Sequence, residues 1–316
     1  MRVEPPYISC VVPAYNEARC ITDFLPCLAK ALAWLSPRYE IIVVNDGSRD
    51  QTSSLVASLC QGHSHIRLIN LSRNFGKEAA LTAGLDHVRG DVAILIDADF
   101  QHPIELIAIF LDRWREGYDM VYGVRESRAD ESPLKRLGAQ LFYRLLNRLS
   151  SIEIPMDAGD FRLLDRKVID ALKAMPERGR FMKGLYAWVG FRSVSVPFAV
   201  QVRHGGHTSF GLRALVRLAQ TGIVAFSDVP LRVWGVIGFL ISAISLLNAL
   251  WIVFDTLVFG NTVPGWATLA VALMFLGGVQ LISIGVLGEY LAGVFNEVKQ
   301  RPTYLVADQI GFDDAD

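Results

Sequence analysis

Two long stretches without charge, close together near the C-terminus, limit most strongly what this 316-residue chain can fold into. Neither Val233–Phe254 nor Thr256–Gly288 contains a charged residue. A helix of about 20 residues crosses the hydrocarbon core of a bilayer, which is ~30 Å thick. We therefore expect a hairpin of two membrane-spanning helices over residues 233–290, with a turn near Pro264. Two buried core helices are the alternative, and the lengths of the stretches disfavour it.

Charged residues beside these stretches predict how the hairpin is oriented. Arg232 precedes it and Lys299 and Arg301 follow it, whereas only Asp255 lies between the two stretches. The positive-inside rule then places both flanking segments in the cytoplasm. We expect a multi-pass protein of the inner (plasma) membrane. A formal net charge of −1 argues against a nucleic-acid partner, because nucleic-acid-binding proteins usually carry a strong basic excess.

The first 125 residues alternate short apolar runs, rich in β-branched residues, with amphipathic segments. This alternation predicts an α/β fold with a mostly parallel sheet and helices on both of its faces. Ligands of such sheets bind beyond the carboxyl ends of the strands. The expected strands are 8–12, 40–44, 66–71, 92–96 and 120–122, and the expected helices are 17–35, 51–60, 76–88 and 104–116.

Polar and acidic residues follow several of these strands, so folding should bring them to one edge of the sheet. Tyr15 and Glu17 follow the first strand, Asp46 follows the second, and Asp97 and Asp99 follow the fourth. A carboxylate pair at a strand end is a hard-oxygen site for Mg²⁺ or Mn²⁺, and such an ion can neutralise a nucleotide diphosphate. The alternative is that Asp97 only caps the following helix.

Two segments before the uncharged stretches combine apolar residues at helical spacing with basic residues. They are residues 133–150 and 212–226. A basic amphipathic helix can lie on an anionic membrane surface. For 133–150, a helix packed on the sheet with a solvated basic face explains the pattern equally well. For 212–226, the position directly before the first uncharged stretch favours the membrane surface.

Four motifs in order resemble family 2 glycosyltransferases that act on polyprenyl phosphates, a group that includes dolichyl-phosphate mannose synthases and bactoprenol glucosyltransferases of the GtrB type. Segments 159–163 and 226–232 are similar to the latter, so the likeness covers nearly the whole chain. The resemblance implies a GT-A fold and a homo-oligomer such as a tetramer. The motifs are Val12–Glu17, Val44–Asp50, Ser72–Glu78 and Asp97–Pro103.

The resemblance also implies roles for individual residues. Nucleotide-sugar contacts fall on Pro13, Tyr15, Glu17, Asp46, Asp97, Ala98 and Arg203, metal ligation on Asp97, Asp99 and Gln101, and lipid-phosphate contacts on Arg125 and Arg136. We place Asp99 and Asp157 at the reaction centre, although structural hydrogen bonds explain Asp157 and Asp160 equally well. Two positions depart from the pattern. Asn45 stands where Asp is frequent, and Ser209 stands where mannose synthases commonly have Lys.

The expected activity is metal-dependent, inverting transfer of a hexose from a nucleotide sugar to a polyprenyl phosphate, with UDP-glucose and undecaprenyl phosphate as first choices. A phosphate monoester is mostly dianionic at neutral pH, so no strong general base is needed. Alternative donors are UDP-N-acetylhexosamine, a modified pentose nucleotide and GDP-mannose, and the alternative class is a non-catalytic membrane scaffold. The expected segments are a GT-A domain (1–210), a juxtamembrane amphipathic helix (211–232), the hairpin (233–290) and a cytosolic tail (291–316).

Overall fold

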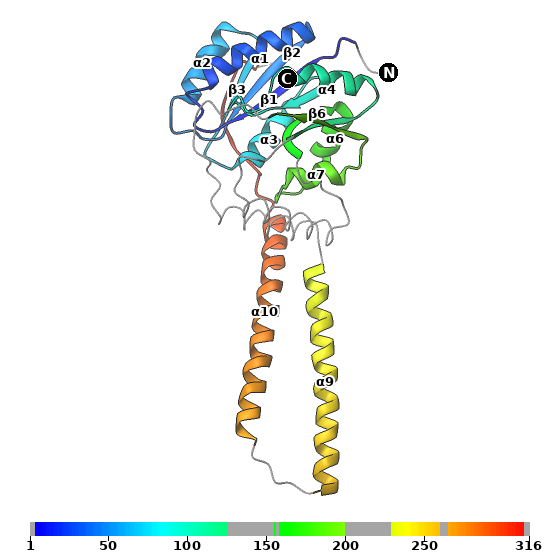
Figure 1. Ribbon diagram of the computed structural model, residues 1–316. Coiled ribbons are helices and arrows are strands. Elements are labelled where there is room, and N and C mark those ends of the chain that lie inside the picture. Colours follow the sequence, from blue (N-terminus) through cyan, green and yellow to red (C-terminus); the bar gives the residue numbers. More distant parts are fainter. Residues whose placement is uncertain (1–3, 126–154, 156–157, 200–228, 260–264, 313–316) are drawn as a thin grey trace.

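The computed structural model describes residues 4–125, 155, 158–199, 229–259 and 265–312. In these residues an α/β domain lies at one end of two long helices (Figure 1). Both basic amphipathic segments, 133–150 and 212–226, lie outside the described residues. Four residues singled out in the sequence do so as well, namely Arg136, Asp157, Arg203 and Ser209.

An eight-stranded sheet forms the centre of the domain, in the order β7-β5-β6-β4-β1-β2-β3-β8. Strand β1 pairs in parallel with β2 and β4, β2 pairs in parallel with β3, and β5 pairs in parallel with β7. Strands β6 and β8 run antiparallel to their neighbours. The sheet is therefore mostly parallel, as the sequence predicts. The strands are β1 (Ile8–Ala14), β2 (Tyr39–Asn45), β3 (Ile66–Leu71), β4 (Val92–Leu95), β5 (Met120–Arg125), β6 (Ala158–Asp165), β7 (Ser193–Phe198) and β8 (Val306–Ile310).

Helices cover both faces of the sheet because residues of the central strands alternate between two apolar clusters. Ile8, Cys10 and Val12 of β1 pack with one helix layer, and Val11 packs with the other. The first layer is α1 (Ile21–Leu35), α2 (Thr52–Gly62) and α4 (Leu106–Arg115). The second is α3 (Lys77–Asp86), α6 (Arg166–Ala174) and α7 (Met182–Trp188), and it lies toward the long helices (Figure 1).

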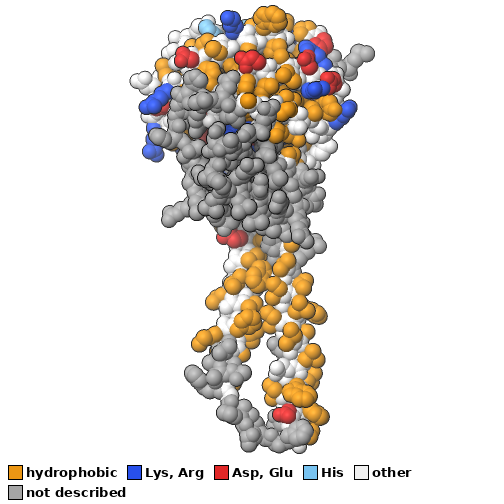
Figure 2. Space-filling model, in the orientation of Figure 1, with side chains coloured by type: hydrophobic (Ala, Val, Ile, Leu, Met, Phe, Trp, Pro, Cys, Tyr) orange, Lys and Arg blue, Asp and Glu red, His pale blue; other side chains and the backbone are white. Residues whose placement is uncertain are grey.

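The two long helices are α9 (Val229–Phe259) and α10 (Trp266–Val298), and they contact one another. Hydrophobic side chains cover the visible face of both, while charged side chains gather on the domain (Figure 2). Among the described residues, one segment, Ala272–Val298, is long and apolar enough to cross a membrane. The helix α10 therefore continues beyond residue 290, where the sequence predicted the hairpin to end.

The chain returns to the domain after α10. Strand β8 pairs with β3 at the edge of the sheet, so the segment treated in the sequence as a separate tail is part of the α/β domain. Side-chain contacts add to this pairing, since Tyr304 Oη donates to Asp86 Oδ2 at 2.8 Å. The domain ends of α9 and α10 consequently lie on the same side of the helix pair (Figure 1).

Candidate active site

The strand order places the candidate site where the connections change direction. Strand β1 has β2 on one side and β4 on the other, and such switch points are where parallel sheets bind ligands. The carboxyl ends of β1, β2, β4 and β5 share this edge. The antiparallel β6 begins there, and its register pairs Arg162 with Leu95, so Asp160 lies opposite the residues that follow β4.

A tight turn follows β4 and carries the two aspartates. Phe100 adopts a left-handed backbone conformation with φ of 59°, which is unfavourable for an aromatic residue. The buried Asp99 supports the turn, because its Oδ1 accepts from the Gln101 backbone N–H at 3.1 Å. Helix α4 begins at Leu106 with Glu105 as its N-cap, so Asp97 does not cap it. The capping alternative for Asp97 is therefore wrong.

Lys77, at the start of α3, bridges two carboxylates at this edge. Its Nζ lies 2.7 Å from Asp97 Oδ1 and 2.8 Å from Asp160 Oδ2. Within the described part of the chain, the buried Oδ1 of Asp160 has no hydrogen-bond partner. No role was predicted for Lys77 from the sequence, although the residue lies in one of the four motifs. The structure thus places a cation between two carboxylates beside the predicted metal site.

The charges of this cluster stabilise one another. Burial alone would raise the pKa of Asp97, but the Lys77 ammonium and the nearby His102 hold it below its usual range. The pKa of Asp160 is lowered in the same way, because Lys77 and Lys183 outweigh its burial. Burial opposes the charge of Lys77, yet the two carboxylates raise the Lys77 pKa above its usual value. The site is therefore ionised at neutral pH.

Asp46 positions the loop that carries Lys77. The Phe75 backbone N–H donates to its Oδ1 at 2.7 Å, and the Gly76 N–H donates to its Oδ2 at 2.9 Å. Burial raises the pKa of Asp46, and these two hydrogen bonds partly offset the effect. Gly76 has φ of 100°, which glycine adopts without strain. The structure therefore gives Asp46 a loop-supporting role in addition to the predicted nucleoside contact.

The loops after β1 and β2 are held together by local hydrogen bonds. The Asn16 backbone N–H donates to Ser48 Oγ at 3.0 Å, and Asn16 Oδ1 accepts from the Arg49 N–H at 2.9 Å. The Glu17 N–H donates to Thr52 Oγ1 at 2.9 Å. Tyr15 lies at the start of this paired loop with 43% of its surface exposed, so its ring is accessible to a ligand.

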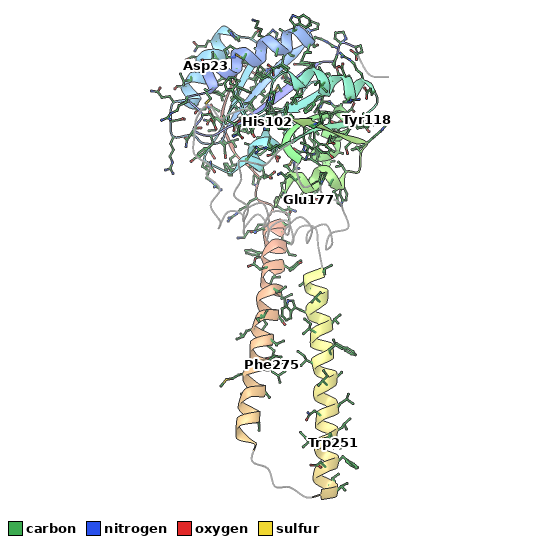
Figure 3. The ribbon with its side chains drawn as sticks, in the orientation of Figure 1. Asp23, His102, Tyr118, Glu177, Trp251 and Phe275 are labelled. Atoms are coloured by element: carbon green, nitrogen blue, oxygen red, sulfur yellow. The ribbon has the colours of Figure 1, made fainter. Side chains whose placement is uncertain are left out.

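Arg125 and His102 complete the edge. Arg125 is the last residue of β5, and its Nη2 donates to Gln101 Oε1 at 3.4 Å, a long hydrogen bond. His102 is buried against the rings of Phe161 and Phe198, with Nε2 3.6 Å from Asp97 Oδ2, and Figure 3 shows it inside the domain. His102 lies within the fourth motif, and the structure places it against an aspartate of the site.

The predicted metal ligands Asp97, Asp99 and Gln101 share the turn after β4. No group of three or more His, Cys, Asp or Glu side chains in the described ranges is placed to hold a metal ion. The donor chemistry nevertheless fits a cation, since the ammonium of Lys77 is bound by two carboxylates here. Oxygen donors of this kind suit Mg²⁺ or Mn²⁺. The choice of these three residues as ligands stays a prediction.

The site is also linked to the end of α10. Glu78, next to Lys77, accepts from the Met182 N–H of α7 at 3.1 Å, and burial with the nearby Asp160 raises its pKa to about 7. The loop before α7 contacts α10, because the Arg178 and Gly179 N–H groups donate to Glu297 Oε1 at 2.9 and 3.0 Å. Residues that hold the site are thus connected to the base of the long helices.

Residues 9–173 match the model of glycosyl transferase family 2, and the chain belongs to this family. The protein is a glycosyltransferase with a GT-A-like α/β fold, which confirms the resemblance carried by its motifs. An uncharacterized glycosyltransferase of Synechocystis is 49% identical over 97% of this chain and 96% of its own length. The SfII prophage-derived bactoprenol glucosyl transferase of Shigella flexneri is 44% identical over 95% of this chain and 97% of its own.

A solved structure, the mannosyltransferase PcManGT of Pyrobaculum calidifontis in complex with GDP-Man and Mn²⁺, aligns with a TM-score of 0.49 and 19% identity. That alignment covers 93% of this chain and 87% of the other.

Proposed function

We propose that this protein transfers glucose from UDP-glucose to undecaprenyl phosphate, with inversion, at the cytoplasmic face of the inner membrane. The observation that carries the proposal is the contact between Arg125 and Gln101. It joins the residue predicted to bind the lipid phosphate to the turn predicted to bind the metal and the diphosphate. Donor and acceptor groups would therefore meet at one point of the sheet edge. The similarity to bactoprenol glucosyl transferases over nearly the whole chain supports this acceptor.

The chemistry requires two anions to approach one another. Their repulsion in a partly desolvated site amounts to several kcal/mol, about 4 kcal/mol for unit charges 4 Å apart at an effective dielectric constant of 20. Arg125 and Arg136 would neutralise the acceptor phosphate, and Arg203 would contact the donor diphosphate. A divalent ion held by Asp97, Asp99 and Gln101 would supply charge neutralisation of the leaving diphosphate. The nucleotide sugar would be held by Tyr15, Glu17 and Asp46, together with Pro13 and Ala98.

The position of the long helices supports a lipid acceptor. We propose that α9 and α10 cross the membrane as a hairpin, which keeps the domain and β8 on one side. Glu297 connects the end of α10 to the layer of helices next to the site. We propose that the lipid headgroup enters the site from the membrane side, where Arg125 would bind its phosphate. The homo-oligomer implied by the family stays a prediction.

An assay of lipid products tests the proposal. Purified protein is incubated with undecaprenyl phosphate and, separately, UDP-glucose, UDP-N-acetylglucosamine and GDP-mannose, and the lipid product is identified by mass. We expect glucosyl phosphoundecaprenol with Mg²⁺ or Mn²⁺, and at least a hundredfold less with a chelator or in Asp99→Ala. Full turnover in the presence of the chelator would contradict metal dependence. A product formed only from another donor would replace glucose as the proposed sugar. No product from any donor would favour the alternative of a non-catalytic membrane scaffold.

A further inference from the structure

The C-terminal strand β8 reaches the loop after β2 through a line of side chains that the sequence did not reveal. Asn70 of β3 is nine-tenths buried and stands opposite Asp308 in the β3–β8 register. Its Nδ2 donates to Asp308 Oδ1 at 2.5 Å. Its Oδ1 accepts from Asn45 Nδ2 at 2.8 Å and from Ser53 Oγ at 2.9 Å. All polar atoms of the Asn70 side chain are therefore engaged.

The line continues from Asn45 to the loops of the site. Asn45 Oδ1 accepts from the Ser48 N–H at 3.1 Å, and Ser48 Oγ accepts from the Asn16 N–H at 3.0 Å. Asn45 directly precedes Asp46, whose carboxylate holds the loop before Lys77. We call Asp308, Asn70, Asn45 and Ser48 the amide relay. It connects β8, which follows the long helices in the sequence, to the two loops predicted to bind the nucleoside.

The carboxylate of Asp308 gives the amide relay its direction. An ionised carboxylate only accepts hydrogen bonds, so Asn70 has to turn its NH₂ group toward Asp308 and its oxygen toward Asn45. Asn45 must then turn its own NH₂ group toward Asn70, which leaves its oxygen for the Ser48 N–H. The Ser48 backbone N–H can only donate, so it requires the same orientation of the Asn45 amide. Asp308 at one end and the Ser48 N–H at the other thus hold a single arrangement of two buried amides.

We propose that Asp308 is a positioning residue for the donor site, which acts through Asn70 and Asn45 to fix the loop 45–49 in the conformation that binds the nucleoside diphosphate. The inference depends on the proposed function only for the identity of the donor nucleotide. It assigns a role to the departure noted in the sequence, because an Asp at position 45 could not donate to Asn70. The segment after α10 then contributes to the site as well as to the sheet.

The experiment compares Asp308→Ala with Gln309→Ala in the full-length protein. Gln309 is the matched control, because it lies on the same strand and contacts His87 instead of Asn70. Calorimetry with UDP measures donor-side binding, and hydrogen exchange of peptides over 45–52 measures the loop without any nucleotide. We expect Asp308→Ala to weaken UDP binding about three- to tenfold and to speed exchange, with the KM for undecaprenyl phosphate unchanged. Gln309→Ala should change neither.

A double variant that swaps the side chains at positions 70 and 308 tests whether the hydrogen bonds, and with them UDP binding, can be restored. Asn70→Asp combined with Asp308→Asn keeps an acceptor for Asn45 and a donor across the strand pair, so it should restore loop protection and UDP affinity. Exchange over 45–52 that is equal in Asp308→Ala and Gln309→Ala would overturn the proposal, as would an equal loss of donor and lipid affinity. If the wild type does not bind UDP, the proposed donor fails, and the exchange experiment still decides the role of Asp308.

Discussion

At the scale of single residues, the site depends on charges that neutralise one another. Lys77 occupies the space between Asp97 and Asp160, where three groups of alternating sign lie within hydrogen-bond distance. The two carboxylates would repel one another without it. A divalent ion at Asp97, as proposed, would have to share this carboxylate with the ammonium. Lys77 would then weaken metal binding by the free protein.

We predict that Lys77→Met strengthens Mn²⁺ binding in the absence of nucleotide. Removing one charge-assisted hydrogen bond to Asp97, worth about 1.5 kcal/mol, should lower the Mn²⁺ dissociation constant roughly tenfold. Electron paramagnetic resonance of free Mn²⁺ during a titration measures this constant. Lys77→Arg retains the charge and serves as the control. An unchanged constant in Lys77→Met would show that the ammonium does not compete with the metal.

At the scale of secondary-structure elements, the position of α3 depends on a close approach to β1. A Cβ placed on Gly84 would lie 2.2 Å from Val11 Cγ1, so the helix can approach the strand only because residue 84 lacks a side chain. Val11 is fully buried and belongs to the apolar cluster that the sheet forms with α3, α6 and α7. Helix α3 carries Lys77 at its first position, and its seating therefore decides where the ammonium lies.

We expect Gly84→Ala to destabilise the protein by about 1 to 3 kcal/mol, because the added methyl group overpacks the interface between α3 and β1. Thermal unfolding in detergent measures the change as a lower Tm. The second substitution Val11→Ala frees space beside the new methyl group, so Gly84→Ala with Val11→Ala should lose less than the sum of the two single variants. Additive losses would indicate that the two side chains do not compete for the same space.

At the scale of the whole molecule, β8 constrains how the chain can cross a membrane. The domain precedes α9 and β8 follows α10, yet β8 is a strand of the same sheet. A helix pair that crosses the membrane as proposed would then return to the side from which it started. Trp251 and Phe275, on the two helices, lie far from the domain in Figure 3, along the apolar length of the pair.

Cysteine labelling in intact cells tests this arrangement. An impermeant thiol reagent added outside should label Asn261→Cys, because the proposed hairpin puts residue 261 on the outer face. Ala315→Cys, beyond β8, should stay protected until the membrane is permeabilised. The native cysteines lie before residue 61, in the domain placed inside, and should add little background. Labelling of Ala315→Cys with protection of Asn261→Cys would reverse the orientation.

The sequence by itself determined the parts of this protein that depend on local pattern. Short apolar runs rich in β-branched residues identified the strands from Ile8 to Tyr122 within about three residues, and the uncharged stretches identified α9 and α10. The motifs identified the family. The strands and long helices can be recognised in the sequence because burial in a core, or contact with lipid, requires apolar residues at neighbouring positions. Asp97 and Asp99 were found in the same way, since they directly follow a strand.

Only the tertiary structure decided which distant residues meet. Several contacts join residues that lie far apart in the sequence, namely the bridge from Lys77 to Asp160, the packing that buries His102, and the pairing of Asp308 with Asn70. No periodicity in the sequence predicts such contacts. Strands β7 and β8 were missed for a related reason, because half of β7 and most of β8 are exposed and both carry a weak apolar pattern. Their places follow from hydrogen bonding to neighbouring strands, which depends on the folded sheet rather than on local composition.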